Sequence, residues 1–259
     1  MQITTITSSL LILILISTPS FAYHMSEEEI VSTVKSSVIT CGSTLRIRNE
    51  ITKYHLSSFN MNWSTGSHLQ IITAVKEDDS YDSLFTIKEG DGLPPCENGE
   101  PIKCNSIIRL EHVKTGKNLH SHEFPSFITR QQEACAFGEN GEGDVNDNFR
   151  IICYKWNEEE IKGETSFFLQ HVPTEQYLFI DYKKSLYNDN NCRGCPINGQ
   201  REVSLTKNKD KQCLWHVAGG ILFNDPDREE ATKNNKNEED NDDGEEIINT
   251  NKNQKKDDL

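Results

Sequence analysis

The stretch Cys104–Leu119, CNSIIRLEHVKTGKNL, contains the pattern that decides the fold, because its spacing occurs twice more in the chain. A turn-forming start is followed after six residues by an apolar residue, and after nine more by a leucine. Short runs with a period of two, separated by turn residues and repeated along a chain, predict β units that share one core. The three sets of anchors are Cys41, Ile47 and Leu56; Cys104, Leu110 and Leu119; and Gly163, Leu169 and Leu178.

Each copy continues with a small apolar alternation and closes on an aromatic residue. The repeat is about 60 residues long, and three copies are too few for a propeller. We therefore predict an all-β fold, a closed β-trefoil of four-stranded units, whose closure leaves no exposed strand edges. The alternations are Ile72 and Ala74, Ala134 and Ala136, and Val203 and Leu205, and the closing aromatics are Phe85, Phe149 and Trp215.

The N-terminal segment differs from a globular domain. Leu10–Ile16 is an unbroken apolar run of seven, followed by small residues up to Ala22, which predicts a signal peptide over 1–22. The run is too short to span a membrane. The predicted order is then a linker over 23–36 and a trefoil over 37–223, with units at about 37–95, 96–158 and 159–223.

The C-terminal segment 224–259 is rich in Asn, Asp, Glu and Lys and has no aromatic residue, which predicts a disordered acidic tail. From Asp225 onward it holds 13 acidic and 6 basic residues, a net −7 of the chain's −14. An acidic balance argues against nucleic acid and anionic lipid as partners, because both bind basic surfaces.

The chain ends in a sequence close to a retrieval signal. Lys256-Asp257-Asp258-Leu259 differs at one position from Lys-Asp-Glu-Leu, with Asp in place of Glu. Together with the signal peptide, it predicts residence in the endoplasmic reticulum (ER) lumen.

The middle unit resembles the stromal cell-derived factor 2 family. The matching stretches are 96–104, 108–122, which includes Leu119-His120-Ser121-His122, and 136–144. The resemblance covers about 38–223 and identifies the repeats as MIR motifs, shared with protein O-mannosyltransferases and with inositol trisphosphate and ryanodine receptors. It implies a β-trefoil and a non-enzymatic role beside luminal chaperones, as a partner of a J-domain co-chaperone and BiP.

Two features depart from the family pattern. The first unit has Leu56-Ser57-Ser58-Phe59 where the family has Leu-His-Ser-His. The third unit carries an insertion near Tyr182–Asn198, which brings Cys192 and Cys195 with it.

Eight cysteines in a chain of the secretory route are expected to be oxidised. Cys96 and Cys104 flank a turn-forming loop, so a local disulfide is the first pairing predicted. Of the four positions that match the family, Cys41 and Cys153 remain, and they can meet in a closed trefoil.

Cys192 and Cys195 have the Cys-x-x-Cys spacing of thiol–disulfide exchange proteins, but they lie between an Asn-rich run and Pro196, which indicates a loop. We expect a structural disulfide, either within the insertion or with Cys135 or Cys213. No second pair of ligands accompanies them, so zinc is not expected there.

His120 and His122 are two residues apart and share one face of a strand, where they can hold a metal or a ligand. Without a third ligand in the sequence, packing and hydrogen bonding are the favoured interpretation, and no metal is predicted. With Arg109 and Asn118 they form the candidate ligand groove, because trefoil loops converge there. Asn62, in Asn62-Trp63-Ser64, is the candidate glycosylation site.

No nucleophile, carboxylate pair or phosphate loop can be assembled with any specificity, so neither an enzyme nor a cofactor is predicted. The leading prediction is a luminal adaptor that assists folding of client proteins with a J-domain co-chaperone and BiP. The first alternative is a glycan-binding MIR module, and the second, less favoured by the sequence, is a thiol–disulfide exchange protein.

Overall fold

The computed structural model describes residues 37–76 and 80–223. The predicted signal peptide, linker, acidic tail and retrieval sequence lie outside these residues. Within the described ranges, none of the helices has the length and apolar character needed to cross a membrane.

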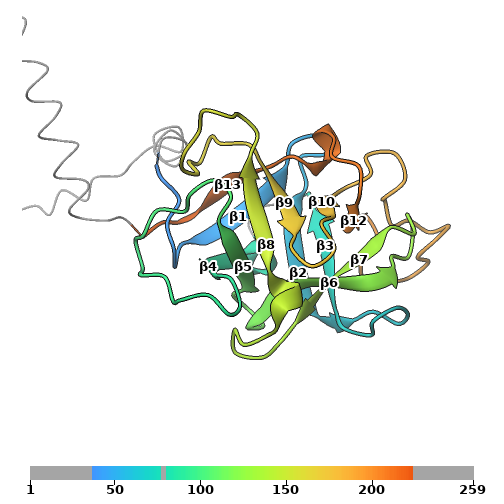
Figure 1. The fold of residues 1–259 in the computed structure, drawn as a ribbon. Coiled ribbons are helices and arrows are strands. Elements are labelled where there is room, and N and C mark those ends of the chain that lie inside the picture. The colour runs from blue at the N-terminus through green and yellow to red at the C-terminus, as the bar shows by residue number, and fades with distance from the viewer. Residues whose placement is uncertain (1–36, 77–79, 224–259) are drawn as a thin grey trace, which may run out of the picture.

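Thirteen strands form one continuous sheet, with three short 3-10 helices between them (Figure 1). The first unit comprises β1 (Thr44–Asn49), β2 (His55–Asn62), β3 (Gln70–Val75), η1 (Tyr81–Ser83) and β4 (Phe85–Glu89). The second comprises β5 (Ile107–His112), β6 (Lys117–Pro125), β7 (Gln132–Phe137), η2 (Val145–Asp147) and β8 (Phe149–Cys153). The third comprises β9 (Phe167–His171), β10 (Tyr177–Phe179), β11 (Arg201–Glu202), β12 (Ser204–Thr206), η3 (Lys211–Cys213) and β13 (Trp215–Ile221).

Six strands close into a barrel. β1 pairs with β4, β4 with β5, β5 with β8, β8 with β9, β9 with β13, and β13 returns to β1, all antiparallel. The hairpins β2–β3, β6–β7 and β10–β12 pair with one another at one end of this barrel. A six-stranded barrel capped by three hairpins is a β-trefoil, so the predicted fold is confirmed.

The repeat anchors meet in one core. Leu56, Leu119 and Leu178 are fully buried at equivalent positions of the three units. The closing aromatics Phe85, Phe149 and Trp215 are also fully buried. Side chains alternate between the faces of a strand, so a period of two in the sequence directs each set inward.

The barrel end opposite the hairpins is closed by a ring of three isoleucines. The amide of Ile39 donates to the carbonyl of Ile161 (2.8 Å), Ile161 donates to Ile102 (2.9 Å), and Ile102 donates back to Ile39 (2.9 Å). All three side chains are buried. The segments before β1, between β4 and β5, and between β8 and β9 therefore cross one another at this end.

The disulfides differ from the predicted pairings. Cys41 is bonded to Cys96 and Cys104 to Cys153, so the predicted Cys96–Cys104 and Cys41–Cys153 pairs are wrong. The segment 96–104 turns at Glu97–Glu100 and then runs across the barrel end, so its two cysteines meet other partners. Near its start, the Gly99 amide donates to the carbonyl of Cys41, and at its end the Cys104 amide donates to Glu159.

The insertion of the third unit packs on the hairpins. Tyr187 is buried between Trp63 of the first unit and Phe127 of the second, with ring centroids 6.3 and 6.4 Å away. Cys192 and Cys195 are bonded to each other within this loop and contact the same cluster. Asn62, beside Trp63, is exposed.

Candidate functional site

Two of the four residues of the predicted groove converge on one backbone oxygen. The carbonyl of Gly141 accepts hydrogen bonds from Arg109 Nη1 and Asn118 Nδ2, both at 3.2 Å. Lys88 Nζ lies 3.1 Å from the same oxygen. Arg109 and Asn118 are buried, so they hold the loop after β7 in place and do not line an open groove.

The two histidines continue this network along β6. His120 is buried, and its Nδ1 lies 2.8 Å from Asp147 Oδ1. Its Nε2 lies 3.3 Å from Nδ1 of His122. Asp147 is fully buried, and its other oxygen accepts from the Asp144 amide at 2.8 Å and from Asn118. A row of three side chains, Asp147, His120 and His122, therefore runs outward from η2, and His122 is the only one of the four predicted groove residues that is not buried.

Two further residues join this row from the neighbouring strand. β6 and β7 pair so that His120 lies opposite Cys135 and Leu119 opposite Ala136. Ala134 and Ala136 face the core, so Glu133 and Cys135 share the outer face with the histidines. His122, Glu133 and Cys135 bring one nitrogen, one oxygen and one sulfur within 4.8 Å of one another. In the sequence, the alternation of Ala134 and Ala136 already implied that Glu133 and Cys135 lie on the opposite, outer face of the strand.

Burial shapes the electrostatics of this face. It lowers the pKa of His122, and the neighbouring His120 adds to the effect. Burial also raises the pKa of Glu133, and this effect is larger than the lowering caused by hydrogen bonds from Ser67. It also raises the pKa of the Cys135 thiol. All three shifts favour the uncharged form of the side chain.

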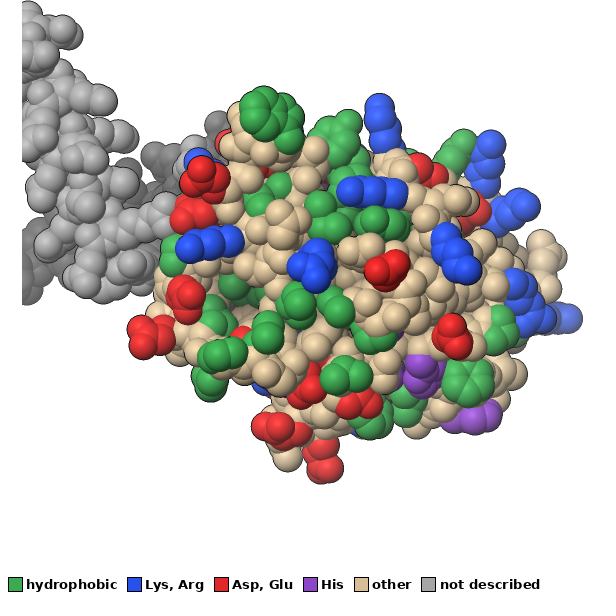
Figure 2. Space-filling model, in the orientation of Figure 1, with side chains coloured by type: hydrophobic (Ala, Val, Ile, Leu, Met, Phe, Trp, Pro, Cys, Tyr) green, Lys and Arg blue, Asp and Glu red, His purple; other side chains and the backbone are tan. Residues whose placement is uncertain are grey.

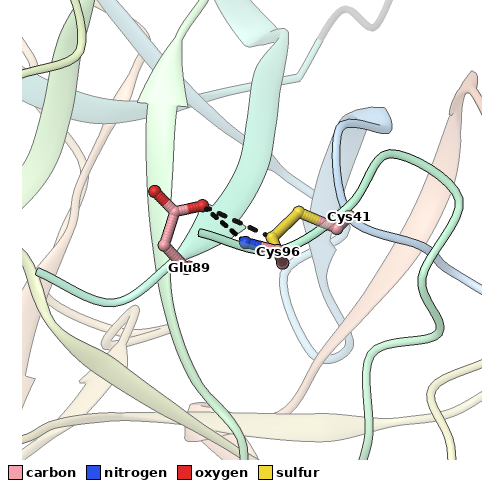
Figure 3. Close-up of side chains that lie close together, drawn as sticks. All are labelled: Cys41, Glu89 and Cys96. Carbon is pink, nitrogen blue, oxygen red and sulfur yellow. Dashed lines mark hydrogen bonds between the residues drawn. A yellow bond between two sulfur atoms is a disulfide. The ribbon is translucent and has the colours of Figure 1, made fainter. Parts of the chain in front are cut away.

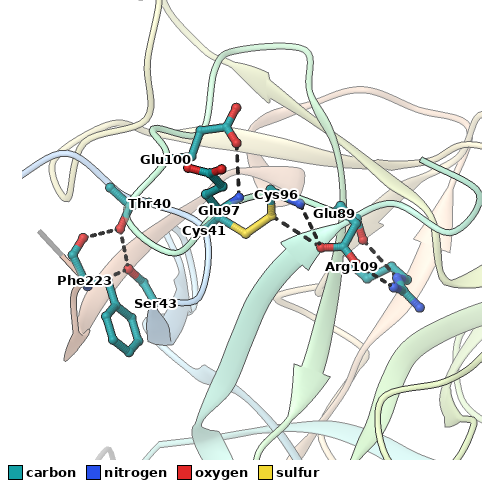
Figure 4. Close-up of a disulfide and its surroundings, with 9 residues drawn as sticks. All are labelled: Thr40, Cys41, Ser43, Glu89, Cys96, Glu97, Glu100, Arg109 and Phe223. Atoms are coloured by element: carbon teal, nitrogen blue, oxygen red, sulfur yellow. Dashed lines mark hydrogen bonds and ion pairs between the residues drawn. A yellow bond between two sulfur atoms is a disulfide. The ribbon is translucent and has the colours of Figure 1, made fainter. Parts of the chain in front are cut away.

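The Cys41–Cys96 disulfide lies beside Glu89, as Figure 3 shows. Glu89 Oε2 is 3.4 Å from both the amide nitrogen and the sulfur of Cys96. A disulfide sulfur carries no hydrogen, so only the amide donates. The other Glu89 oxygen pairs with Arg109 Nη2 at 3.3 Å (Figure 4). Since the two sulfurs are bonded to each other, this group links the disulfide to the barrel and is not a metal site.

The two free thiols are buried, at Cys135 and Cys213. Burial raises the pKa of Cys213 to about 11. Reactive cysteines have a lowered pKa and an accessible thiolate, which neither residue has. Their surroundings therefore do not favour disulfide exchange.

Comparison with known proteins relates this architecture to a family. Residues 54–217 match the MIR domain. The chain is 37% identical over 188 residues to human stromal cell-derived factor 2, covering 72% of this chain and 82% of that protein. It is 35% identical over 192 residues to stromal cell-derived factor 2-like protein 1 of Mus musculus, covering 74% and 81%. The crystal structure of the SDF2-like protein from Arabidopsis thaliana is similar with a TM-score of 0.66 and 29% identity, covering 73% and 98%.

Proposed function

Because this chain belongs to the stromal cell-derived factor 2 family of MIR-domain proteins, we propose that it is a non-enzymatic adaptor of the ER lumen that assists protein folding. Its proposed partners are a J-domain co-chaperone, the Hsp70-type chaperone BiP, and unfolded clients. The adaptor would bring these proteins together through its surface loops, with no covalent chemistry and no nucleotide.

The observation that carries this proposal is an exposed aromatic pair on the loop between β8 and β9. Trp156 is 97% exposed and Tyr154 is 52% exposed. Tryptophan and tyrosine supply much of the binding energy in protein interfaces, so two of them exposed on one loop mark a candidate contact surface. Figure 2 shows apolar side chains interspersed with acidic and basic ones over the viewed face, a mixture that suits a protein interface.

The disulfides support the proposed compartment. The described residues contain three of them, Cys41–Cys96, Cys104–Cys153 and Cys192–Cys195. Structural disulfides persist in oxidising compartments such as the ER lumen and are rare in the cytosol.

A pull-down from luminal extract tests the proposal. The full chain is expected to recover a J-domain protein and BiP, and Trp156→Ala is expected to reduce that recovery. Tyr81→Ala is the matched control, because Tyr81 is an aromatic residue 74% exposed in a different unit. Recovery of neither chaperone by the unaltered chain contradicts the adaptor function, and equal recovery by all three proteins contradicts the role of Trp156.

A glycan-binding function is the second candidate. A hollow of about 320 Å³ between the second and third units is lined by polar side chains that include Asp181, Asn208 and Asp210. Phe179 also lines it, but its ring is 6% exposed and offers little face for a sugar to stack on. Binding on a glycan array that is lost in Asp210→Ala would favour this function over the adaptor, and an empty array would remove it.

A further inference from the structure

We propose that His122, Glu133 and Cys135 form a zinc site on the outer face of the β6–β7 hairpin. A ring nitrogen of His122, a Glu133 carboxylate oxygen and Cys135 Sγ all lie within 4.8 Å of one another. Imidazole, thiolate and carboxylate are the groups that bind zinc in proteins, at about 2.0 to 2.3 Å from the ion. Binding one ion at these distances requires side-chain rotations that bring the three donors closer together.

The three donors differ in their present hydrogen bonding. Nε2 of His122 is buried and has no hydrogen-bond partner among the described residues. Glu133 accepts a hydrogen bond at 3.3 Å from the Ser67 amide, and the Ser67 side chain interacts with both Glu133 and Cys135. Cys135 Sγ also makes a 3.7 Å contact with the carbonyl of His120. Buried polar atoms in native proteins are nearly always paired, so the unpaired Nε2 of His122 beside a carboxylate and a thiol indicates room for a ligand.

The internal repeat provides a comparison for Glu133. Glu202 occupies the equivalent position in the third unit, since Leu205 and Ala136 are the matching strand residues. Glu202 is as buried as Glu133, yet it accepts four hydrogen bonds of 2.5 to 3.0 Å from the loop of the preceding unit. Glu133 bonds to the corresponding loop of the first unit through Ser67, so its carboxylate has fewer hydrogen-bond partners than that of Glu202 and can also take a cation.

The other positions of the site are also specific to the second unit. Where it has His122 and Cys135, the first unit has Phe59 and Thr73, which cannot assemble the same donors. The Thr73 hydroxyl is already bonded to Gln200 at 2.5 Å. Among the described residues, the β6–β7 hairpin is the one hairpin that groups nitrogen, oxygen and sulfur donors on its outer face.

The row behind His122 orients it for a metal. Asp147 Oδ1 contacts Nδ1 of His120 at 2.8 Å, and Nε2 of His120 contacts Nδ1 of His122 at 3.3 Å. A metal-binding histidine characteristically bonds through its second ring nitrogen to such a partner, which fixes the ring. Because Nδ1 of His122 is engaged by His120, Nε2 is the nitrogen left to bind an ion together with Glu133 and Cys135.

The donor set selects the ion. Calcium and magnesium prefer oxygen ligands, whereas a thiolate with an imidazole favours zinc. Binding would displace the thiol proton of Cys135 to solvent, because the thiolate is the ligand. A water molecule would complete the four-coordinate shell.

The test uses the untagged full chain, treated with chelator and kept free of thiol reductant so that its disulfides persist. Zinc is titrated in competition with a chromophoric chelator, and cobalt(II) is used as the spectroscopic probe. We expect one zinc per chain and a thiolate-to-cobalt charge-transfer band. Cys135→Ser is expected to abolish the band, and His122→Gln is expected to weaken zinc binding about 100-fold or more. Asp147→Asn, which alters the residue that positions His122 through His120, is expected to weaken zinc binding about 10- to 100-fold.

Two matched variants serve as controls. Cys213→Ser removes the other buried free thiol, and Glu202→Gln alters the equivalent glutamate of the third unit, so both should keep the band and the zinc affinity. Circular dichroism of each metal-free variant checks its fold, and His122→Gln carries the test if Cys135→Ser does not fold, because His122 is partly exposed. A chain that gives no charge-transfer band, or a folded His122→Gln variant with unchanged zinc affinity, overturns the site.

Discussion

Nε2 of His171, in β9, lies 3.0 Å from the carbonyl oxygen of Asn146 in η2, so a side chain of the third unit is bonded to the backbone of the second. The repeat places a buried polar residue at this position in every unit, and each contacts the middle residue of the 3-10 helix of a neighbouring unit. The three contacts close a ring around the barrel. The other two are His112 Nε2 to Asp82 O at 3.2 Å and Asn49 Nδ2 to Gln212 O at 2.8 Å.

Because His171 is buried, we expect the free energy of unfolding to fall in acid. Burial outweighs the bond to Asn146 and lowers its pKa from 6.5 to about 4. Between these two values the unfolded chain binds a proton that the folded chain does not, so the free energy of unfolding falls as the pH falls from 6.5 to about 4. This histidine should contribute on the order of 3 kcal/mol to the fall. Urea denaturation at a series of pH values measures it.

A substitution suggested by the repeat isolates this effect. His171→Asn introduces the residue that the first unit uses at the same position, where Asn49 bonds to Gln212 without titrating. We expect the variant to remain folded at pH 7 and to show a shallower loss of stability between pH 6.5 and 4. The same slope in both proteins would show that His171 does not cause the acid sensitivity.

We expect the isoleucine ring to make a large packing contribution at the barrel end that it closes. Ile161→Ala should destabilise the fold by about 2 to 5 kcal/mol, because it leaves a cavity among buried side chains. Ile221→Ala is the control, since Ile221 is 71% exposed and its loss should change stability by about 0.5 kcal/mol or less. Thermal or urea unfolding compares the two, and equal losses would contradict the ring's structural role.

The disulfide map predicts a definite peptide pattern. Digestion without reductant, followed by mass spectrometry, should recover Cys41 joined to Cys96, Cys104 joined to Cys153, and Cys192 joined to Cys195. A peptide that joins Cys96 to Cys104 would contradict the structure.

The same disulfides should differ in their contribution to stability. The Cys41–Cys96 bond spans 55 residues and Cys192–Cys195 spans 3. Chain entropy favours the longer loop, so replacing both cysteines of the first pair by Ala should cost about 4 kcal/mol, against about 2 kcal/mol for the second. Urea unfolding of the two double variants measures the difference, and a larger loss for the Cys192–Cys195 pair would contradict this reasoning.

The fold was predictable because it rests on local patterns. The spacing of Leu56, Leu119 and Leu178 repeats, and strand alternation alone directs all three inward. The closing aromatics follow the same rule. A threefold barrel needs no information beyond the recurrence of one unit.

The pairing of the barrel disulfides could not be predicted from the sequence, because cysteines that are close along the chain are not bonded to each other in the barrel. Cys96 and Cys104 are eight residues apart in the sequence, but the segment between them turns at Glu97–Glu100 and then crosses the barrel end. Which cysteine each one meets depends on how the three connections cross, and that crossing is set by the closed barrel.

The sequence by itself determined the β-trefoil, its core and its family, since these follow from a repeated period and from matching residues. The tertiary structure alone decided that His122 meets Glu133 and Cys135, because the β6–β7 register and the bulge in it bring residues from two strands onto one outer face. It also decided that Arg109, Asn118 and His120 are buried, since their hydrogen-bond partners lie on loops that only folding brings to them.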